Sequence, residues 1–400
     1  MENRHMPHDL AQMQSLPLEA KIRMTQARIK VWHESWKRFE IVNKETGKTR
    51  FETIDCRDIF AEPKLKDNEY IKEINDGQVY LSLSGGKDST VLKHIVDSMY
   101  SDVPSVFVNT GLEYPEIQQF VRDIKAGKYD CFNSDVEILR PEMRFDEVIK
   151  KYGYPVISKE VSKMIKEGRS ARHKGRADYY AIQKLQGTLK NKDGTKSQFN
   201  CEKYYFLLDS PFLISHQCCD VMKKRPIKKY EKATNRKPFI GTMACESRQR
   251  FAQWIKNGCN SFEKNAPSSQ PLSFWTEQDV LHYIKKFNVP YCSAYGDIVI
   301  DDRTEDTLEG QINMIDYLGC YEQHDLLKTT KCNRTGCIFC MFGCHLEKEP
   351  NRFQRLKETH PRQYEYCIGG GEYNEEGKWQ PSKEGLGMGK VLDYIGVKYD

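Results

Sequence analysis

The sequence lacks a long apolar run. Its 400 residues include 30% charged side chains, and their mean hydropathy is -0.72. No stretch approaches the roughly 18 apolar residues that a membrane span needs, and the first residues lack the apolar segment of a signal peptide. We therefore expect a soluble, cytoplasmic protein with no membrane partner.

The excess of positive over negative charge is also small, since the formal net charge is only +5. The basic residues are nevertheless clustered. Residues 150–196 hold 13 Lys and Arg against 4 Asp and Glu, and residues 223–237 hold 8 against 1. Local basic surfaces of this kind suit nucleotides or nucleic acid, and a solvated helix face has the same composition, so both interpretations stay open here.

A Walker A loop is absent, although the sequence predicts a phosphate-binding loop. Residues 79–83 form an apolar run of strand length, two glycines follow, and apolar residues then recur at helical spacing. The N–H groups at the start of that helix, together with Lys87, are arranged to bind phosphate oxygens. Asp88 follows the lysine and Leu81 stands where Walker A has its first glycine, so the nucleotide chemistry should differ from that of kinases and GTPases.

Predicted strands and helices alternate from residue 79 onward. The predicted elements are strands at 79–83, 105–109, 136–139 and 238–242, a helix through 248–255, and a helix opened by a capping-box pattern at 276–279. This alternation predicts an α/β fold with a doubly wound, mostly parallel sheet. Ligands bind such sheets beyond the carboxyl ends of the strands. The further candidate nucleotide contacts at those ends are Thr110, Gly111, Glu113, Gly241, Arg248 and Arg250.

The sequence pattern divides the chain into three segments. Residues 1–75 are expected to be a helical N-terminal extension, because the apolar stripe over residues 18–39 has helical spacing. Residues 76–300 form the expected nucleotide-binding α/β domain, interrupted by a basic helical insertion at about 158–210. Residues 301–400 are expected to be a cysteine-rich region followed by a flexible, glycine-rich tail.

The 14 cysteines do not resemble a disulfide framework, because we expect a reducing compartment. Two groups stand apart from the others: Cys218-Cys219, and Cys332-x4-Cys337-x2-Cys340-x3-Cys344. A Cys-x-x-Cys turn places two thiolates within reach of one metal centre, and a second pair completes four-coordinate ligation. One solution is zinc bound by the four C-terminal cysteines alone. The other is a [4Fe-4S] cluster bound by Cys218, Cys219, Cys337 and Cys340.

The string from Ser84 to Ser89, Ser-Gly-Gly-Lys-Asp-Ser, resembles the PP-loop of the ATP pyrophosphatase superfamily. There the loop holds the pyrophosphate that leaves when ATP is split between its α and β phosphates, and the substrate is transiently adenylated. The phosphoadenosine-phosphosulfate (PAPS) reductase branch uses the loop to hold a sulfated nucleotide. The resemblance implies ATP or an adenylyl-sulfate-type nucleotide, Mg²⁺, and catalytic roles for Lys87 and Asp88. The implied phosphate-binding residues are Ser84, Gly85, Gly86, Lys87, Asp88 and Ser89.

A second resemblance concerns the cysteines. The segment Cys218-Cys219-x-x-Met-Lys-Lys-Arg-Pro is similar to the Cys-Cys-x-x-x-Lys-x-x-Pro segment of adenylyl-sulfate (APS) reductases, and the likeness extends in patches over residues 78–345. In that family a double cysteine and a later Cys-x-x-Cys hold a [4Fe-4S] cluster. The implied ligands are Cys218, Cys219, Cys337 and Cys340, with Cys332 and Cys344 as alternates.

The chain departs from the APS reductases in its tail. Those enzymes end in a Glu-Cys-Gly-x-His-type string whose cysteine attacks the sulfate sulfur, and this string is missing here. Cys367 is the only cysteine of the tail and is therefore a candidate catalytic nucleophile. It lacks the neighbouring Glu and His, and no local feature of the sequence lowers its pKa.

Three functions fit these patterns. The first is ATP-dependent adenylation, giving AMP and pyrophosphate, coupled to sulfur transfer. Here the chain resembles the PAPS-reductase-like proteins of DNA phosphorothioation, which implies a nucleic-acid acceptor and a sulfur donor such as a cysteine desulfurase. The second is an APS or PAPS reductase that produces sulfite. The third is a non-catalytic nucleotide and iron-sulfur sensor or DNA-binding module.

Overall fold

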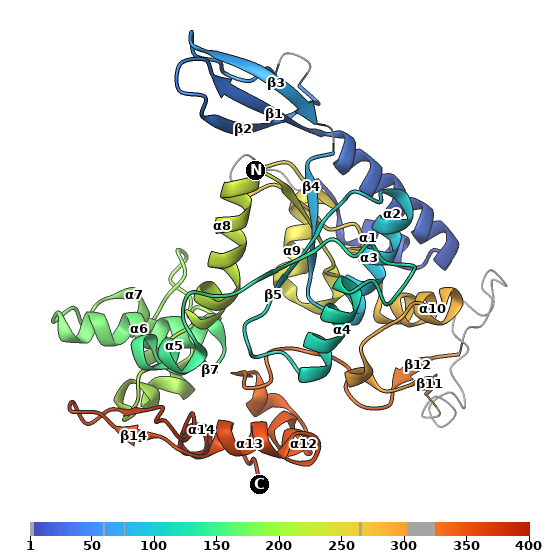
Figure 1. Cartoon of the computed structure of the whole chain (residues 1–400). Helices are drawn as coiled ribbons and strands as arrows, with labels where there is room; N and C mark the ends of the chain where they lie inside the picture. The colour runs from blue at the N-terminus through green and yellow to red at the C-terminus, as the bar shows by residue number, and fades with distance from the viewer. Residues whose placement is uncertain (1–3, 59–60, 76, 264–265, 302–324) are drawn as a thin grey trace. The chain divides into compact units, whose positions relative to one another are not determined.

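The computed structural model describes residues 4–58, 61–75, 77–263, 266–301 and 325–400. They form two compact units, each assembled from separate stretches of the chain (Figure 1). The first unit contains Met1–Val108, Tyr114–Leu139 and Lys228–Thr335, and the second contains Asn109–Glu113, Arg140–Ile227 and Gly336–Asp400. The boundaries proposed from the sequence at residues 75 and 300 stay predictions.

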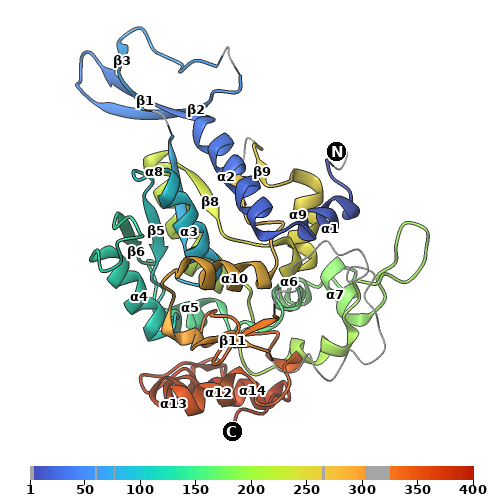
Figure 2. The same cartoon turned by 90° about the vertical axis from the view of Figure 1, so that its right-hand side faces the viewer.

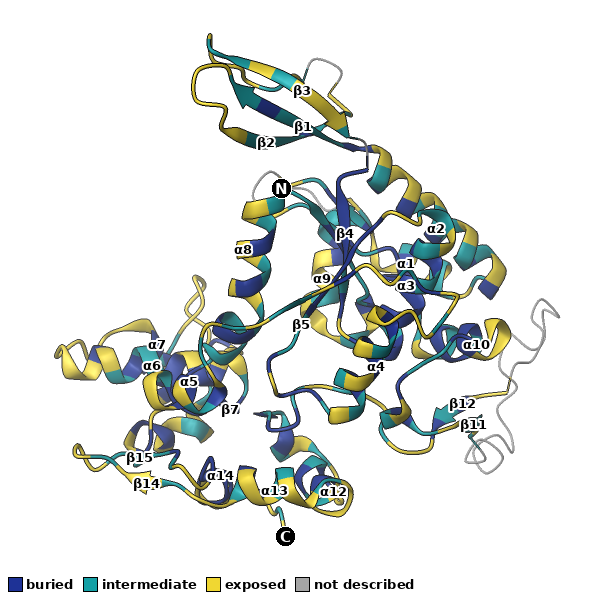
Figure 3. Cartoon of the chain, in the orientation of Figure 1, coloured by how far each residue is buried: buried dark blue, intermediate teal, exposed yellow. Residues whose placement is uncertain are grey.

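A mostly parallel sheet forms the centre of the first unit, with strand order β6-β5-β4-β8-β10-β9. Its strands are β4 (Val79–Leu83), β5 (Ser105–Val108), β6 (Val136–Leu139), β8 (Lys237–Ile240), β9 (Asn260–Ser261) and β10 (Ser268–Ser269). The pairs from β6 to β10 are parallel, and β9 pairs antiparallel with β10. Val79, Leu81 and Phe239 are fully buried, as apolar strands of a covered parallel sheet should be (Figure 3). The predicted α/β class is confirmed.

Helix α3 (Lys87–Met99) follows β4 and contacts both α2 (Leu18–Glu34) and α10 (Glu277–Phe287). The capping box predicted for α10 is confirmed, because the Thr276 hydroxyl accepts the Asp279 N–H and the Asp279 carboxylate accepts the Thr276 N–H. The unit also contains α1 (Pro7–Gln14), α4 (Pro115–Lys125), η3 (Ala244–Glu246), α9 (Arg248–Asn257), η4 (Ser293–Tyr295), β11 (Ile298–Ile300) and β12 (Leu327–Thr329).

The N-terminal segment differs from the prediction. Helix α2 ends at Glu34, and β1 (Trp36–Asn43) begins two residues later, so the helical extension predicted through residue 75 is wrong beyond α2. β1 pairs antiparallel with β2 (Thr49–Asp55) and β3 (Glu69–Asn75). Two tryptophans spaced by four residues fit a helical face, but the second already belongs to a β1 segment rich in aromatic and β-branched residues, which favour a strand.

The second unit combines short helices with two-stranded pairings. Its elements are α5 (Phe145–Tyr152), β7 (Val156–Ile157), α6 (Lys159–His173), α7 (Tyr180–Gln186), η1 (Glu202–Asp209), η2 (Asp220–Lys224), β13 (Met341–Phe342), η6 (Cys344–Leu346), α12 (Arg352–Thr359), α13 (Pro361–Ile368), β14 (Glu372–Tyr373), β15 (Trp379–Gln380) and α14 (Met388–Tyr394). Helix α8 (Arg225–Thr234) continues directly from η2. β13 pairs in parallel with β7, and β14 pairs antiparallel with β15. Within the described ranges, no helix is both long and apolar enough to cross a bilayer.

The glycine-rich tail is folded rather than flexible, which corrects the prediction. Leu386, Met388 and Val391 are fully buried. The glycines serve close packing: a Cβ added at Gly385 would lie 2.4 Å from the Gly369 carbonyl oxygen. The tail is therefore rich in glycine for a steric reason, since only glycine allows the two backbone segments to approach so closely.

Candidate functional site

The predicted phosphate loop is the turn from β4 into α3 in the first unit. Gly85 has a φ of +73°, and a Cβ added there would lie 2.8 Å from Ile117 Cγ2, so glycine is required for both conformation and space. The Ser89 hydroxyl accepts the Ser84 N–H at 3.2 Å and donates to the Gly86 carbonyl at 3.0 Å. These bonds hold the loop in a narrow turn at the N-terminus of α3.

Gly241 lies against the same turn, as predicted from its place at the end of β8. A Cβ at Gly241 would come within 2.9 Å of Ser89 Cα and 3.1 Å of Ser89 N. Glycine is therefore needed where the backbone after β8 meets the start of α3. The structure thus brings this strand end and the phosphate loop together, as expected for parallel strands whose carboxyl ends meet at one edge.

Lys87 is 3% exposed and is held by groups that its sequence neighbourhood did not reveal. Its ammonium lies 2.9 Å from a Glu277 carboxylate oxygen and donates to the Asn333 carbonyl at 2.7 Å. Its backbone N–H donates to the Tyr295 hydroxyl at 3.1 Å, and that hydroxyl lies 2.7 Å from the Thr335 hydroxyl. Two donors expected for phosphate therefore engage protein oxygens in this structure.

Asp88 has a different environment. Its Oδ1 atom is buried and has no hydrogen-bond partner among the described residues. Burial raises the pKa of Asp88, while the charges of Lys87, Arg334 and Arg250 oppose that rise. A carboxylate oxygen without a protein partner beside several cations suits a ligand that supplies its own positive charge, such as a hydrated metal ion.

Two further basic candidates lie at the start of α9. Arg250 pairs with Glu246, and burial lowers the pKa of Arg250 while the Asp88 charge opposes that effect. The charge of Asp88 thus acts on Arg250, and the role of Arg250 in nucleotide binding stays a prediction. Arg248 is exposed at the first position of α9, and the described contacts do not tie it to the loop. Cys245, which the sequence did not single out, is an exposed thiol on η3 whose charge also interacts with that of Asp88.

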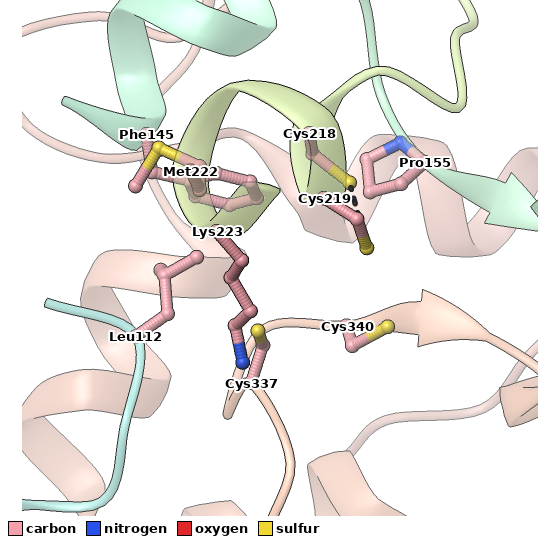
Figure 4. Close-up of a pocket in the computed structure, with 9 residues that line it drawn as sticks. All are labelled: Leu112, Phe145, Pro155, Cys218, Cys219, Met222, Lys223, Cys337 and Cys340. Carbon is pink, nitrogen blue, oxygen red and sulfur yellow. Dashed lines mark hydrogen bonds between the residues drawn. The ribbon is translucent and has the colours of Figure 1, made fainter. Parts of the chain in front are cut away.

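The four predicted cluster ligands line one pocket in the second unit (Figure 4). Cys218 and Cys219 immediately precede η2, and Cys337 and Cys340 lie in the loop before β13. Figure 4 shows the Cys219 sulfur pointing toward the segment that holds Cys337 and Cys340, while the Cys340 sulfur points away from Cys337. Folding thus brings together two cysteine pairs that are 118 positions apart in the sequence.

Cations surround these thiols. A hydrogen bond from Cys218, at an Sγ–Sγ distance of 4.0 Å, is the main cause that lowers the pKa of Cys219 to about 6, and Lys159 and Lys223 act in the same direction. Burial raises the pKa of Cys337 to about 11, with Lys223 opposing the rise. Burial alone would lower the pKa of Lys223, but Cys337 and Glu113 hold it above its ordinary value.

The four cysteines provide sulfur ligands that suit a soft metal centre, and they line the same pocket. Four sulfur ligands from two pairs are the set used by structural zinc and by [4Fe-4S] clusters. The positive side chains beside them would offset the negative charge of four thiolates. Among the described residues, however, no three His, Cys, Asp or Glu side chains already lie close enough to share one ion. Binding a metal or cluster would therefore require side-chain movements.

The alternate ligands lie elsewhere. Cys332 belongs to the first unit, where its thiol donates to the Ala294 carbonyl at 2.9 Å. Cys344 is buried in the second unit, and its thiol donates to the Met341 carbonyl at 3.0 Å rather than lining the pocket. Cys367 is fully buried on α13 with its sulfur 3.4 Å from the Met388 sulfur, and burial raises its pKa. This environment does not suit a nucleophile.

The remaining nucleotide candidates follow β5 but belong to the second unit. Glu113 accepts hydrogen bonds from the Thr110 N–H and hydroxyl at 3.0 and 2.7 Å. A Glu113 oxygen also lies 3.7 Å from the Lys223 ammonium. Gly111 has a φ of +74° between them. This turn therefore connects to the cysteine pocket through Lys223, a link that strand order alone did not predict.

An α/β unit with a glycine-rich turn between strand and helix, together with a unit in which four cysteines line one pocket, is the arrangement expected for a PP-loop protein of the PAPS reductase type. The family model described as the phosphoadenosine phosphosulfate reductase domain matches residues 78–189 and 176–341. The chain belongs to this family.

The other comparisons are weaker. Among 22 similar solved chains is the phosphoadenylyl-sulfate reductase of Candida auris in its phosphate complex. It shares 15% identity, covers 54% of this chain and 75% of its own, and has a TM-score of 0.30. At these values the family assignment rests on the family model alone. No curated protein matches the sequence significantly.

Proposed function

We propose that this protein binds an adenine nucleotide at the phosphate loop and uses it to adenylate a substrate oxygen, releasing pyrophosphate before sulfur is transferred. The observation that carries the proposal is the loop itself. It joins a glycine turn, a buried lysine and a carboxylate with one unpartnered oxygen at a single helix start. Family membership supports a role in sulfur and nucleotide chemistry.

The loop residues have distinct roles in this proposal. The N–H groups of Gly86 and Lys87 face the N-terminal end of α3, where backbone dipoles favour an anion. The Lys87 ammonium neutralises the β and γ phosphates once Glu277 releases it. The free oxygen of Asp88 is suited to hold Mg²⁺, whose charge offsets that of the leaving pyrophosphate.

Three bond exchanges make up the reaction. An oxygen of the acceptor attacks the α phosphorus of ATP, the α–β phosphoanhydride breaks, and pyrophosphate leaves with the electron pair. The outer sulfur of a persulfide, supplied by a donor such as a cysteine desulfurase, then displaces AMP from the adenylated position. A thiol reductant finally cleaves the remaining sulfur–sulfur bond.

The cysteine pocket is proposed to hold a [4Fe-4S] cluster on Cys218, Cys219, Cys337 and Cys340. Its all-sulfur donor set and the adjacent Lys159 and Lys223 charges support this assignment. A bound cluster would supply an electron-accepting, polarising centre. Zinc on the same thiols is the alternative, and the iron and acid-labile sulfide content of anaerobically purified protein separates the two.

Reduction of APS or PAPS to sulfite is the second candidate, and family membership favours it. In that reaction a thiolate attacks the sulfate sulfur, the sulfur–oxygen bond to the nucleotide breaks, and a thiol donor later releases sulfite. The buried Cys367 argues against it, because the expected tail nucleophile is inaccessible. A non-catalytic sensor is the third candidate.

One set of incubations separates these functions. With ATP, acceptor extract and sulfur donor, we expect AMP and pyrophosphate, and a loss of about 100-fold in Lys87→Ala. The Lys128→Ala variant, which changes an exposed lysine of the same unit, is the matched control. Formation of ADP would refute the adenylation mechanism. Sulfite from APS or PAPS would favour the reductase, and nucleotide binding without any turnover would favour the sensor.

A further inference from the structure

Helices α6 and α7 of the basic insertion lie next to each other in the second unit (Figure 2). Arg169 on α6 donates to the backbone carbonyls of Leu207, Leu208, Ser210 and Phe212. Ile165 and Leu185 are fully buried, so α6 and α7 also share apolar packing. Side chains on this part of the surface therefore project from a fixed framework.

Two groups of cations in the insertion differ in their partners. The first group has acidic partners and consists of Lys163 with Glu167, Arg172 with Asp209, Lys184 with Glu160, and Lys196 with Glu202. The second group is exposed, forms no ion pair with any described residue, and includes Lys174, Arg176, Lys190 and Lys192. The second group supplies positive charge that the protein does not neutralise itself.

Large rings are exposed beside these cations. Tyr180 is 45% exposed, Phe199 is 59% exposed, and Tyr179 is 37% exposed. The Lys184 ammonium lies 5.0 Å from the centre of the Tyr180 ring and 5.4 Å from that of Phe199, so both rings lie close to one lysine. Neighbouring exposed rings rimmed by polar residues are typical of a surface that binds a partner.

A pocket at the end of α6 joins both features. Lys174, Arg176 and Tyr179 line it together with Glu167 and Ser170. The turn is fixed by backbone hydrogen bonds, including the Arg176 N–H to the Ala171 carbonyl at 2.9 Å. Two cations can bind a phosphate here while the tyrosine ring offers a stacking face, and the carboxylate and hydroxyl can bind base edges.

We propose that this surface binds single-stranded nucleic acid. Its backbone would contact Lys174, Arg176, Lys190 and Lys192, and unpaired bases would stack on Tyr179, Tyr180 and Phe199. Single strands fit better than a duplex, because exposed rings can stack only on bases that are not already paired and stacked. The proposal identifies a class for the nucleic-acid acceptor, but binding itself does not depend on adenylation.

The test measures the fluorescence anisotropy of a labelled oligothymidylate of about 15 nucleotides with the full chain and no ATP. We expect the Lys174→Glu/Arg176→Glu double variant to bind at least tenfold more weakly. For this variant, the slope of log affinity against log salt concentration should also be shallower by about 1.4, which corresponds to two lost phosphate contacts. Tyr179→Ala should weaken binding about tenfold with an unchanged salt slope, because it removes stacking rather than charge.

The matched control is Arg362→Glu/Lys383→Glu, which makes the same change of charge at exposed positions of the same unit. It should bind within about twofold of the unchanged protein, since neither residue lines the pocket at the end of α6. Equal loss in the control, preference for duplex DNA, or binding to anionic phosphatidylserine vesicles instead of the oligonucleotide would overturn the proposal. Because no turnover is measured, failure here leaves the test of AMP formation intact.

Discussion

At the scale of single residues, the phosphate loop is closed by protein groups that a nucleotide must displace. The Tyr295 hydroxyl accepts the Lys87 N–H, and Glu277 holds the Lys87 ammonium. We predict that Tyr295→Phe binds ATP about 2- to 10-fold more tightly, the value of one competing hydrogen bond, when measured by titration calorimetry. Tyr283→Phe, whose hydroxyl instead contacts His94, should leave affinity unchanged. Weaker binding by Tyr295→Phe would mean that this hydroxyl contacts the ligand.

The charged Asp88 carboxylate should lower the stability of the fold while it supports the proposed reaction. Burial raises the pKa of this carboxyl, so ionisation favours the unfolded chain as pH rises from the ordinary aspartate pKa through the raised value. We predict that Asp88→Asn unfolds at a higher temperature than the unchanged protein at pH 7. The two should converge in acid, where Asp88 is protonated in both states.

The same substitution should lower AMP formation about 100-fold, since it removes the charge proposed to hold Mg²⁺. Thermal unfolding from pH 3 to pH 8 and a coupled pyrophosphate assay check both parts. A variant that is less stable at neutral pH would show that the Asp88 carboxylate has a stabilising partner in the fold.

At the scale of elements, α3 contains a buried ion pair whose lysine also donates a hydrogen bond to the sheet. The Lys93 ammonium is fully buried, 2.9 Å from Asp97 Oδ2 and 2.9 Å from the Ser105 hydroxyl at the start of β5. Lys93→Met should cost about 3–5 kcal/mol in urea unfolding, because it leaves a buried carboxylate unpaired. The double variant Lys93→Met/Asp97→Leu should recover most of that loss.

The exposed pair between Lys128 and Asp123 provides the control for this prediction, and Lys128→Met should change stability little. If the double variant loses as much free energy as Lys93→Met and Asp97→Leu together, the ion pair has no coupling energy and does not stabilise α3. Double-mutant analysis of urea midpoints distinguishes the two outcomes.

The elements predicted from the sequence agree with the structure where the apolar periodicity is strong and belongs to a single helix or strand. The strands β4, β5, β6 and β8 and the helices α3, α9 and α10 lie within a few residues of their predicted bounds. It failed at residues 36–75, where a four-residue spacing of tryptophans spans a helix end and a strand start. β9 and β10 were missed because two-residue strands carry no periodicity.

In the candidate sites, too, the residues within short sequence motifs could be predicted, whereas those that reach the site from distant parts of the chain could not. The glycine loop and the two cysteine pairs are local strings, so the sequence predicted that they matter. Tyr295, Glu277 and Lys159 reach their sites only through folding, from positions far away in the chain. No string around them indicates a role, and only tertiary contacts reveal one.

At the scale of the whole molecule, the second unit depends on segments joined across long sequence distances. Its cysteine pocket connects the stretch before η2 with the loop before β13. A centre bound by all four thiols would act as a cross-link between these segments, because the unfolded chain holds no such preformed site. Metal loading should therefore stabilise the second unit selectively.

We predict that loaded protein resists limited proteolysis within residues 140–227 and 336–400. At free metal about 100 times the dissociation constant, cleavage there should be about 100-fold slower than after chelation. Cys337→Ser should lose bound metal and behave like the chelated protein, while Cys131→Ser, an exposed thiol of the first unit, should behave like the loaded one. Metal content by mass spectrometry and cleavage sites by peptide mapping give the two readouts. Equal protection in loaded and Cys337→Ser protein would mean that apolar packing alone holds the segments together, and that these thiols have no structural metal.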